Sequence, residues 1–323
     1  MITNLFEIPE CVSTDRPEGQ AGLAPDARVR EPKGLCRPVA LVLCGGGARG
    51  AMEVGFYQAL AELQIPIDMV IGSSVGALNG AFIAAGMPPE KLAELWCGIR
   101  RRDIAKLNWK GLLHPSRLTG LWLLEPLREL MEAALPVFTF EELALPLTIT
   151  TTDIQTTQAV YWSGSGNLVD PVLASMSIPG LFSPVVIGGR QYVDGAIANN
   201  VPLDRTLAQG ARTALFALCT CCTPAAMPVS GLVHVLTRSF MAALNVKYQS
   251  DVRHYQSQLD LHVIEPRYGR EVGLLDFTHT RELITAGYRE TMEYFSTLKF
   301  DLNAEVERSP ACRNIASYCV KQG

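Results

Sequence analysis

Residues 39–50 read VALVLCGGGARG and residues 69–80 read MVIGSSVGALNG. In each segment a short apolar run ends in glycines and leads into a helical pattern, over residues 52–63 in the first and 77–85 in the second. Such units are typical of βαβ structure with parallel strands. The carboxyl ends of neighbouring parallel strands meet at one edge of a sheet, where helix amino termini offer free N–H groups. We therefore expect an α/β fold with both glycine loops at that edge.

The second loop has the G-x-S-x-G form of a nucleophile elbow, with Ser74 between Gly72 and Gly76. In such an elbow the serine sits on a sharp strand-to-helix turn, and the glycines remove side chains that would collide there. The pattern is short and weak by itself, but its position directly after an apolar strand and before an apolar helix strengthens it. Ser74 is therefore the candidate nucleophile.

The first loop carries backbone N–H donors and no nucleophilic side chain, so it is the candidate oxyanion hole beside the serine. We expect the N–H groups of Gly46 and Gly47 to hold the oxyanion, with Arg49 shaping the loop. The full set of candidate residues in this loop is Gly45, Gly46, Gly47, Arg49 and Gly50.

A competing interpretation of the same loop is a dinucleotide site. Three of its glycines satisfy G-x-G-x-x-G, and Asp68 lies near the offset of a ribose-binding carboxylate. In that motif, however, the acid follows the second strand, whereas Asp68 precedes the apolar run at residues 69–71. The nucleotide hypothesis also leaves Ser74 without a role, so it ranks below the catalytic one.

GGGARG followed by GSSVG resembles the patatin-like phospholipases, a family of lipid acyl hydrolases. The resemblance continues, in the family's order, in SIPGLFSP, YVDGA and NNVP, which begin at residues 177, 192 and 199, and it covers about residues 38–300. It implies a three-layer α/β/α domain with a mostly parallel central sheet. It also implies a catalytic Ser–Asp dyad, here Ser74 and Asp194, that works through an acyl-enzyme without a histidine or a cofactor.

If its motif stood alone, Asp194 would be better explained as an ordinary Asp-Gly turn residue without a catalytic role. A serine hydroxyl needs a base in contact as it attacks. A free aspartate, with a pKa of about 3.9, is a weak base, and burial would strengthen it. The alternative is a Ser–Asp–His triad, for which His279, just before a predicted helix at 282–294, is the histidine to test.

The resemblance leaves phospholipid, lysophospholipid and neutral lipid open as substrates. An acyltransferase, in which an alcohol replaces water as the acceptor, remains an alternative to a hydrolase. A catalytically silent lipid-binding module is disfavoured because the serine, the aspartate and the glycine loop are all intact.

The composition is that of a globular protein. The 323 residues are 48% hydrophobic and 19% charged, and the net charge of −4 gives no sign of a nucleic-acid partner. No run reaches the roughly 20 apolar residues of a membrane span, and residues 1–37 lack the apolar core of a secretory signal. We expect a disordered tail at 1–37, the patatin-like domain at 38–300 and a loose tail at 301–323.

The nine cysteines are odd in number and have no disulfide-like spacing, so we expect a reducing, cytoplasmic location. Cys219, Cys221 and Cys222 invite a metal site, but no histidine pair or second C-x-x-C accompanies them. They end an apolar run at 213–218, and packing of small residues at a strand end is the simpler account. We expect no metal ion.

Residues 98–122 are rich in basic side chains and tryptophan. Six basic residues stand against the single acid Asp103, and Trp96, Trp109 and Trp122 lie in or beside the segment. Basic residues interleaved with tryptophan and leucine suit the interface of an anionic bilayer, so we expect peripheral membrane contact here. The alternative is a solvated insertion whose tryptophans belong to the core.

Overall fold

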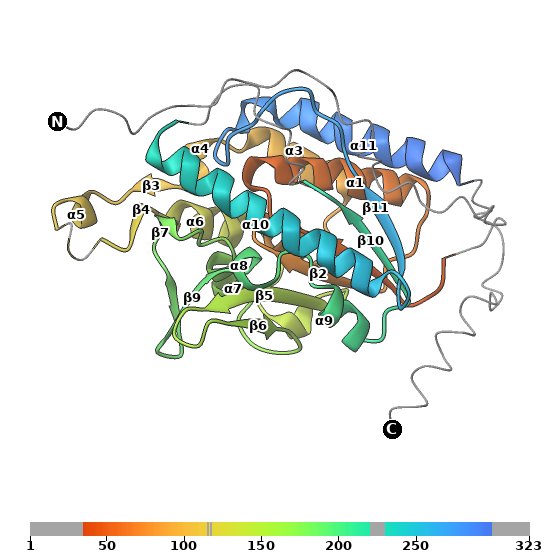
Figure 1. Ribbon diagram of the computed structural model, residues 1–323, viewed down its shortest axis with the longest axis horizontal. Helices are drawn as coiled ribbons and strands as arrows, with labels where there is room; N and C mark the ends of the chain where they lie inside the picture. Colours follow the sequence, from red (N-terminus) through yellow and green to blue (C-terminus); the bar gives the residue numbers. More distant parts are fainter. Residues whose placement is uncertain (1–34, 115, 117, 220–229, 299–323) are drawn as a thin grey trace, which may run out of the picture. The chain divides into compact units, whose positions relative to one another are not determined.

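An eight-stranded sheet forms the centre of the fold in this computed structural model, which describes residues 35–114, 116, 118–219 and 230–298 (Figure 1). Its strands are β1 (Val39–Leu43), β2 (Met69–Ser73), β5 (Leu147–Asp153), β6 (Gln158–Trp162), β8 (Val185–Ile187), β9 (Arg190–Asp194), β10 (Thr213–Ala217) and β11 (Asp260–Ile264). The strand order is β11-β10-β1-β2-β5-β9-β8, and β6 also pairs with β5. The strands from β11 to β5 run parallel to one another, whereas β6, β8 and β9 pair in antiparallel fashion. The prediction of a mostly parallel sheet is confirmed.

The parallel strands β1 and β10 are fully buried. Burial on both faces explains why these strands read as continuous apolar runs and do not alternate with polar residues.

Helices flank the sheet on both faces. The α-helices are α1 (Ala51–Glu62), α2 (Val75–Ala84), α3 (Pro89–Gly98), α4 (Arg101–Ile104), α5 (Trp109–Leu112), α6 (Glu125–Ala134), α7 (Val169–Ser175), α8 (Ala196–Asn199), α9 (Leu203–Ala208), α10 (Leu232–Tyr255) and α11 (Thr280–Thr297). Among the described residues, the 3₁₀ helices are η1 (Gly47–Gly50), η3 (Phe140–Glu142) and η4 (Phe277–His279).

The direction of the strand connections explains how the layers form. The connections from β1 to β2 and from β2 to β5 run the same way along the sheet, so right-handed crossovers put α1 and α2 on the same face. The connection from β10 to β11 runs the other way and carries α10 to the opposite face, where Figure 1 shows it crossing the sheet. Helices α3 and α11 pack on α1. This is the expected three-layer arrangement.

A second, three-stranded sheet was not predicted. It consists of β3 (Lys106–Leu107), β4 (Gly120–Leu123) and β7 (Gly180–Phe182). Strands this short leave no alternation that a sequence pattern can reveal. Together with α5, the β3–β4 hairpin projects from the main sheet (Figure 1).

The first described residues are attached to the domain. Leu35 is buried, and Arg37 forms an ion pair with Asp68 in the turn before β2. Residues 35–37, which the sequence analysis assigned to a tail, therefore pack on the domain. The other residues of both predicted tails lie outside the described residues.

The cysteines depart in part from the expectation of free thiols. Cys36 is disulfide-bonded, which differs from what the expected reducing location implies for this cysteine. Among the described cysteines, Cys44, Cys97 and Cys219 are free. Within the described chain, no helix has both the length and the apolar character needed to cross a membrane.

Candidate active site

Ser74 occupies the sharp turn between β2 and α2. Its backbone has φ 55° and ψ −129°, a positive φ that non-glycine residues rarely adopt. The flanking glycines make the turn possible. A Cβ on Gly72 would lie 2.5 Å from the carbonyl oxygen of Gly76, and a Cβ on Gly76 would lie 2.3 Å from that of Leu43. The turn therefore has the geometry of an elbow, with Ser74 at the amino end of α2.

Ser74 and Asp194 are 120 positions apart in the sequence, and they meet because two strands end against the same edge of β5. One edge of β5 is occupied by β6 over residues 149–153. On the other edge β2 pairs with residues 147–150, and β9 takes over at residues 151–153. Because β9 runs antiparallel to β5, its carboxyl end points at the carboxyl end of β2.

The side chains of Ser74 and Asp194 form a buried hydrogen-bonded pair. The Ser74 hydroxyl donates to Oδ2 of Asp194 at 2.7 Å, and the N–H of Ala196 donates to Oδ1 at 2.8 Å. Asp194 is 1% and Ser74 4% exposed. Burial raises the pKa of Asp194 to about 7, although the hydrogen bonds from Ser74 and Ala196 act in the opposite direction. A carboxylate with this pKa is a much better base than a free aspartate.

Two further hydroxyl side chains, Ser175 and Thr152, hold this pair in position. Ser175 Oγ accepts the N–H of Ser74 at 2.8 Å and donates to the carbonyl of Thr150 at 2.6 Å. Thr152 Oγ1 donates to the carbonyl of Asp194 at 2.9 Å. Neither contact has a local sequence signal, because each joins segments that are distant in the chain.

The glycine loop runs from the end of β1 through η1 into α1. The N–H of Gly45, a candidate residue of this loop, donates to Oδ1 of Asn200 at 2.8 Å and is therefore already paired. In the described part of the chain, the N–H groups of Gly46 and Gly47 have no protein acceptor. Arg49 Nε donates to the carbonyl of Gly46 at 3.2 Å and so holds the loop in shape.

The loop and the elbow are in direct contact. A Cβ on Gly45 would lie 3.0 Å from Cβ of Ser74, and a Cβ on Gly50 would lie 2.6 Å from a methyl carbon of Val75. Gly47 has φ 58°, and a Cβ there would lie 2.5 Å from the carbonyl oxygen of Leu274. Glycines at these positions bring the unpaired N–H groups next to the serine.

Comparison with known proteins identifies the family. The family model described as patatin-like phospholipase matches residues 41–207, which is more than half of the chain and includes the glycine loop, the elbow and Asp194. The chain belongs to the patatin-like phospholipase family.

Relatives of this patatin-like chain include longer proteins. An uncharacterized NTE family protein of Mycobacterium bovis is 34% identical over 165 residues, 51% of this chain and 44% of that protein. Patatin-like phospholipase domain-containing protein 6 of Homo sapiens is 32% identical over 184 residues, 55% of this chain and 13% of that protein. The chain thus spans less than half the length of these relatives. Among solved structures, VipD from Legionella pneumophila aligns with 83% of this chain and 67% of its own, at 17% identity and a TM-score of 0.46.

In the patatin-like domain Ser74 borders a narrow cavity of about 20 Å³. Apart from Ser74, its walls are apolar side chains and the backbone of the glycine loop. Trp96 belongs to these walls and is 1% exposed. The expectation that it anchors the protein to a membrane is therefore wrong, and the alternative of a core tryptophan holds at this position.

No histidine side chain in the described part of the chain contacts Ser74 or Asp194. His279 lies at the amino end of α11 with Nδ1 3.6 Å from Glu282, and His262 is buried with a ring nitrogen 3.0 Å from the Tyr294 hydroxyl. The triad alternative therefore lacks its third member among these residues.

The dinucleotide interpretation also fails on geometry. Asp68 precedes β2 and accepts the N–H of Val39, the first residue of β1, at 2.7 Å. Its carboxylate therefore lies at the amino ends of the strands, at the sheet edge opposite the glycine loop. A ribose bound beside that loop is out of its reach.

Proposed function

We propose that this patatin-like protein hydrolyses acyl esters of lipids, with Ser74 as the nucleophile and Asp194 as the general base. The observation that carries the proposal is the 2.7 Å hydrogen bond from the Ser74 hydroxyl to a buried carboxylate at a nucleophile elbow. The family description, patatin-like phospholipase, supports a lipid as the substrate. The chemistry proposed below uses no cofactor.

In the acylation step, Ser74 Oγ attacks the ester carbonyl carbon while Asp194 Oδ2 takes the hydroxyl proton. The carbonyl oxygen becomes an oxyanion, which the free N–H groups of Gly46 and Gly47 are available to stabilise, together with the positive amino end of α2. When the tetrahedral intermediate collapses, the proton passes from Asp194 to the leaving alcohol. The acyl group is then linked to Ser74 Oγ as an ester, the acyl-enzyme.

In the deacylation step, water replaces the alcohol. The water attacks the acyl carbon while Asp194 takes a proton from it. Asp194 then gives this proton to Ser74 Oγ as the bond between Ser74 and the acyl group breaks and the fatty acid leaves. If an alcohol enters in place of water, the same steps transfer the acyl group and the protein is an acyltransferase. The two outcomes differ only in the acceptor.

The apolar walls around Ser74 suit the acyl chain. A cavity of about 20 Å³ has room for a single water molecule, so an acyl chain has to displace side chains as it enters. Leu274, Leu275 and Phe277, in the segment before α11, line the cavity and are only half-buried. We propose that they move to admit the substrate.

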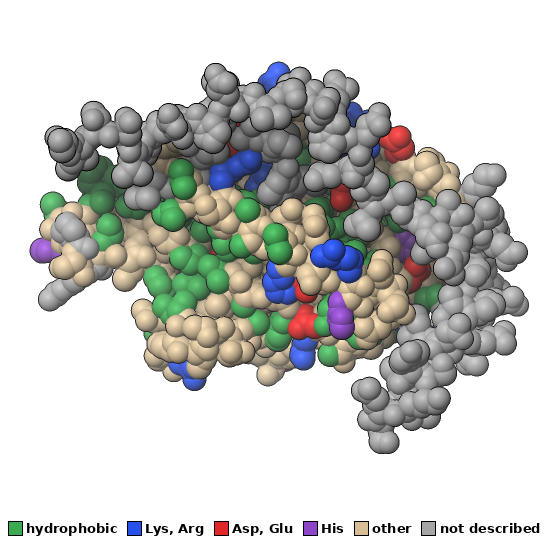
Figure 2. Space-filling view, in the orientation of Figure 1, with side chains coloured by type: hydrophobic (Ala, Val, Ile, Leu, Met, Phe, Trp, Pro, Cys, Tyr) green, Lys and Arg blue, Asp and Glu red, His purple; other side chains and the backbone are tan. Residues whose placement is uncertain are grey.

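We further propose that the lipid surface is met by the tip around α5. Trp109 and Leu113 are 70% and 77% exposed there, and Lys110 between them is exposed as well. Trp122 packs partly against the core with Arg101 over its ring at 4.0 Å, which leaves Trp109 as the exposed aromatic anchor. In Figure 2, hydrophobic side chains gather both on this tip and on the adjoining surface near α8.

Labelling with a fluorophosphonate probe tests the proposal. The probe reacts with activated serines, and we expect mapping by mass spectrometry to find it on Ser74. Ser74→Ala should remove the label, and Asp194→Asn should slow labelling strongly. Assays with a phospholipid, in the presence and absence of an added lysolipid acceptor, then distinguish hydrolysis from acyl transfer. Labelling of another serine, or unchanged labelling of Ser74→Ala, would contradict the proposal.

A further inference from the structure

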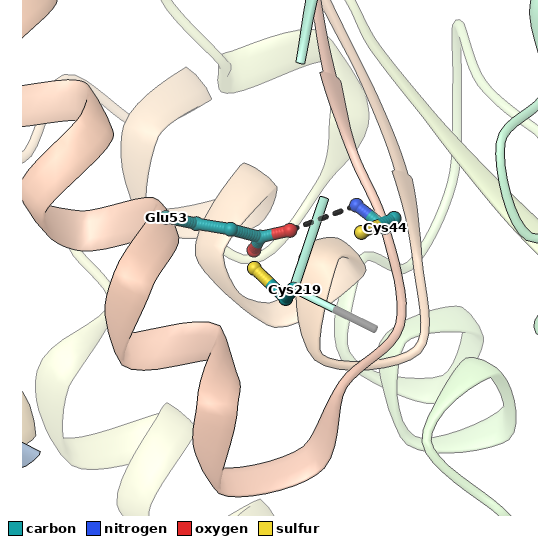
Figure 3. A group of neighbouring side chains, drawn as sticks. All are labelled: Cys44, Glu53 and Cys219. Carbon is teal, nitrogen blue, oxygen red and sulfur yellow. Dashed lines mark hydrogen bonds between the residues drawn. The ribbon is translucent and has the colours of Figure 1, made fainter. Parts of the chain in front are cut away.

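Three side chains from separate parts of the chain converge behind the glycine loop. Cys44 directly follows β1, Glu53 lies in the first turn of α1, and Cys219 lies two residues beyond β10. Their sulfur and carboxylate atoms all lie within 4.8 Å of one another, and all three residues are buried. Figure 3 shows both thiols directed at the Glu53 carboxylate. We call these residues the thiol–carboxylate cluster.

The carboxylate of this cluster is held in a fixed orientation. One oxygen of Glu53 accepts the N–H of Cys44 and the other accepts the side-chain amide of Asn79, each at 2.8 Å. The same amide group donates to the carbonyl of Gly50 at 3.0 Å, and Asn79 Oδ1 accepts the indole N–H of Trp96 at 2.8 Å. Each carboxylate oxygen thus keeps a lone pair that these hydrogen bonds do not use.

The packing of the fold leaves this carboxylate unexplained. Glu53 is 0% exposed, and none of the described Lys, Arg or His side chains lies within ion-pair distance of it. Buried carboxylates are normally paired with a cation or bound to a metal. Both thiols approach the single carbonyl oxygen of Ala217, at 3.3 Å from Cys44 and 3.8 Å from Cys219, and they otherwise face each other and Glu53.

We propose that the thiol–carboxylate cluster binds a zinc ion. Zinc accepts thiolate sulfur at about 2.3 Å and carboxylate oxygen at about 2.0–2.2 Å. In a tetrahedral site these lengths place the ligand atoms about 3.6–3.8 Å apart, which is compatible with ligand atoms that all lie within 4.8 Å of one another. The hydrogen bonds to Glu53 correspond to the outer contacts that orient carboxylate ligands in metal sites.

The mixed set of donors selects zinc over other metals. Two thiolates exclude the hard cations Mg²⁺ and Ca²⁺, which prefer oxygen ligands. The carboxylate is a poor ligand for Cu(I), and a cluster with two cysteines falls short of the four that iron–sulfur centres use. Binding replaces the two thiol protons, which leave for solvent.

In the proposed site, water entering from a neighbouring cavity would supply the fourth ligand. Cys219 lies in the wall of a cavity of about 720 Å³ that is also lined by Met52, Arg49 and the segment at 265–274. This cavity gives a zinc ion a path to the otherwise buried cluster. Three protein ligands and one water complete the four-coordinate geometry that zinc prefers.

The position of the site points to a structural role. Zinc at the cluster would tie the end of β1, the start of α1 and the end of β10 together. A Cβ on Gly46 would lie only 3.0 Å from Cβ of Cys219, so the cluster forms the floor beneath the glycine loop. The proposal does not depend on the Ser74 chemistry, and Ser74→Ala should bind zinc like the parent.

The test is zinc and cobalt binding to the full chain, purified under reducing, metal-free conditions. We expect about one zinc per chain, a thiolate-to-cobalt charge-transfer absorption with Co²⁺, and a higher Tm with zinc present. Cys44→Ser, Cys219→Ser and Glu53→Gln should each weaken zinc binding roughly 10-fold or more. Cys97→Ser, which removes an exposed free thiol, is the matched control and should leave binding unchanged.

A second control removes the neighbouring cysteines Cys221 and Cys222, which lie outside the described residues, with a double serine variant. Loss of cobalt absorption in this variant or in Cys97→Ser, with retention in Cys44→Ser, would overturn the proposal. A parent protein that binds no cobalt through sulfur, or that contains a Cys44–Cys219 disulfide under these conditions, would do the same. If the cluster variants do not fold, the proposal is judged from the cobalt absorption of the parent and of the two control variants. The absorption should be present in all three proteins.

Discussion

Ser74 and Asp194 act as one unit in the proposed mechanism, because the hydroxyl is a weak nucleophile without the carboxylate. Ser74→Ala and Asp194→Asn are each expected to abolish ester hydrolysis, and the double variant should lose little more than either one. His279→Ala should keep most of the activity. Steady-state kinetics on a soluble short-chain ester measures all four variants. A folded but inactive His279→Ala protein would favour the triad mechanism.

The raised pKa of Asp194 predicts how turnover depends on pH. Asp194 can accept the Ser74 proton only when it is ionised, and its pKa is about 7. We therefore expect log kcat/KM to rise with pH up to about 7 and to level off above it. A pH series on a non-ionising ester measures this profile. Full activity down to about pH 5 would mean that the carboxylate is not the base.

The same pKa determines the sign of a stability effect. The pKa of Asp194 is about 7 in the folded chain and close to 3.8 when unfolded. Between pH 3.8 and about pH 7, Asp194 carries a proton in the folded chain but not in the unfolded one. Its contribution to the free energy of unfolding is therefore largest below the unfolded pKa and is lost as the pH rises through the folded pKa. Asp194→Asn removes the buried charge and should raise Tm at about pH 8 but not at about pH 4.

Asp153→Asn is the control for that measurement. Although burial raises the pKa of Asp153, the hydrogen bonds from the N–H groups of Thr156 and Gln155, together with the Arg190 guanidinium, lower it overall. This group stabilises the fold above its unfolded pKa, so the substitution should lower Tm at about pH 8. Equal effects of the two substitutions would contradict the different environments assigned to the two carboxylates.

The oxyanion donors are tested by adding a methyl group to the loop. In Gly46→Ala the new Cβ would lie 3.0 Å from Cβ of Cys219, so the loop has to shift and displace its N–H groups. We expect kcat to fall by roughly 10²–10³ with a smaller change in KM. Gly269→Ala, where a Cβ meets nothing within 4 Å, is the control. Equal losses in kcat and in substrate affinity would indicate a collapsed loop instead.

At the scale of elements, α1 and α11 cross in backbone contact. A Cβ on Gly55 would lie 1.9 Å from the carbonyl oxygen of Ile284, and a Cβ on Gly287 would lie 2.0 Å from that of Met52. Gly55→Ala or Gly287→Ala should therefore force the helices apart and reduce the free energy of unfolding by about 1–3 kcal/mol. Urea unfolding measures the change, with Gly98→Ala, in open space at the end of α3, as the control.

An unchanged urea midpoint in either α1–α11 variant would mean that the helices have room to separate without cost. The contact matters for the site because α1 carries Glu53 and begins at the glycine loop. The segment before α11 supplies Leu274, Leu275 and Phe277 to the cavity beside Ser74.

At the scale of the whole molecule, the tip around α5 is expected to control binding to membranes. Basic residues near an anionic surface contribute about 1 kcal/mol each and are screened by salt. Vesicle sedimentation should show binding that needs anionic lipid, weakens with salt, and drops in Trp109→Ala and in the triple Glu variant of Arg100, Arg101 and Arg102. Activity on a soluble ester should survive these changes.

The matched control is Val246→Ala, since Val246 is a similarly exposed apolar residue, 68% exposed, on α10. It should bind vesicles as the parent does. If instead the triple Glu variant binds anionic vesicles like the parent, the basic segment is only a solvated surface. The lipid-facing side would then lie elsewhere, such as the hydrophobic surface near α8 in Figure 2.

Local patterns in the sequence determined the elements that carry most of the site. Apolar runs ending in glycine predicted β1, β2, α1 and α2 closely, because buried parallel strands are continuous apolar runs whose ends are marked by turn residues. The elbow at Ser74 and the loop from Gly45 to Gly50 follow from glycine spacing together with the apolar strand before each loop and the helix after it. The short strands β3, β4 and β7 were missed because they hold too few residues to display a period.

Only the tertiary structure decided how the remaining groups meet. The end-to-end arrangement of β2 and β9 along one edge of β5 brings Asp194 to a serine 120 positions away, and no local pattern encodes that pairing. Long-range packing also places Asn200 where it accepts the N–H of Gly45, and it places Trp96 in the wall of the cavity beside Ser74. Sequence periodicity reports which face of an element is buried, whereas the partner that covers it is set by long-range packing.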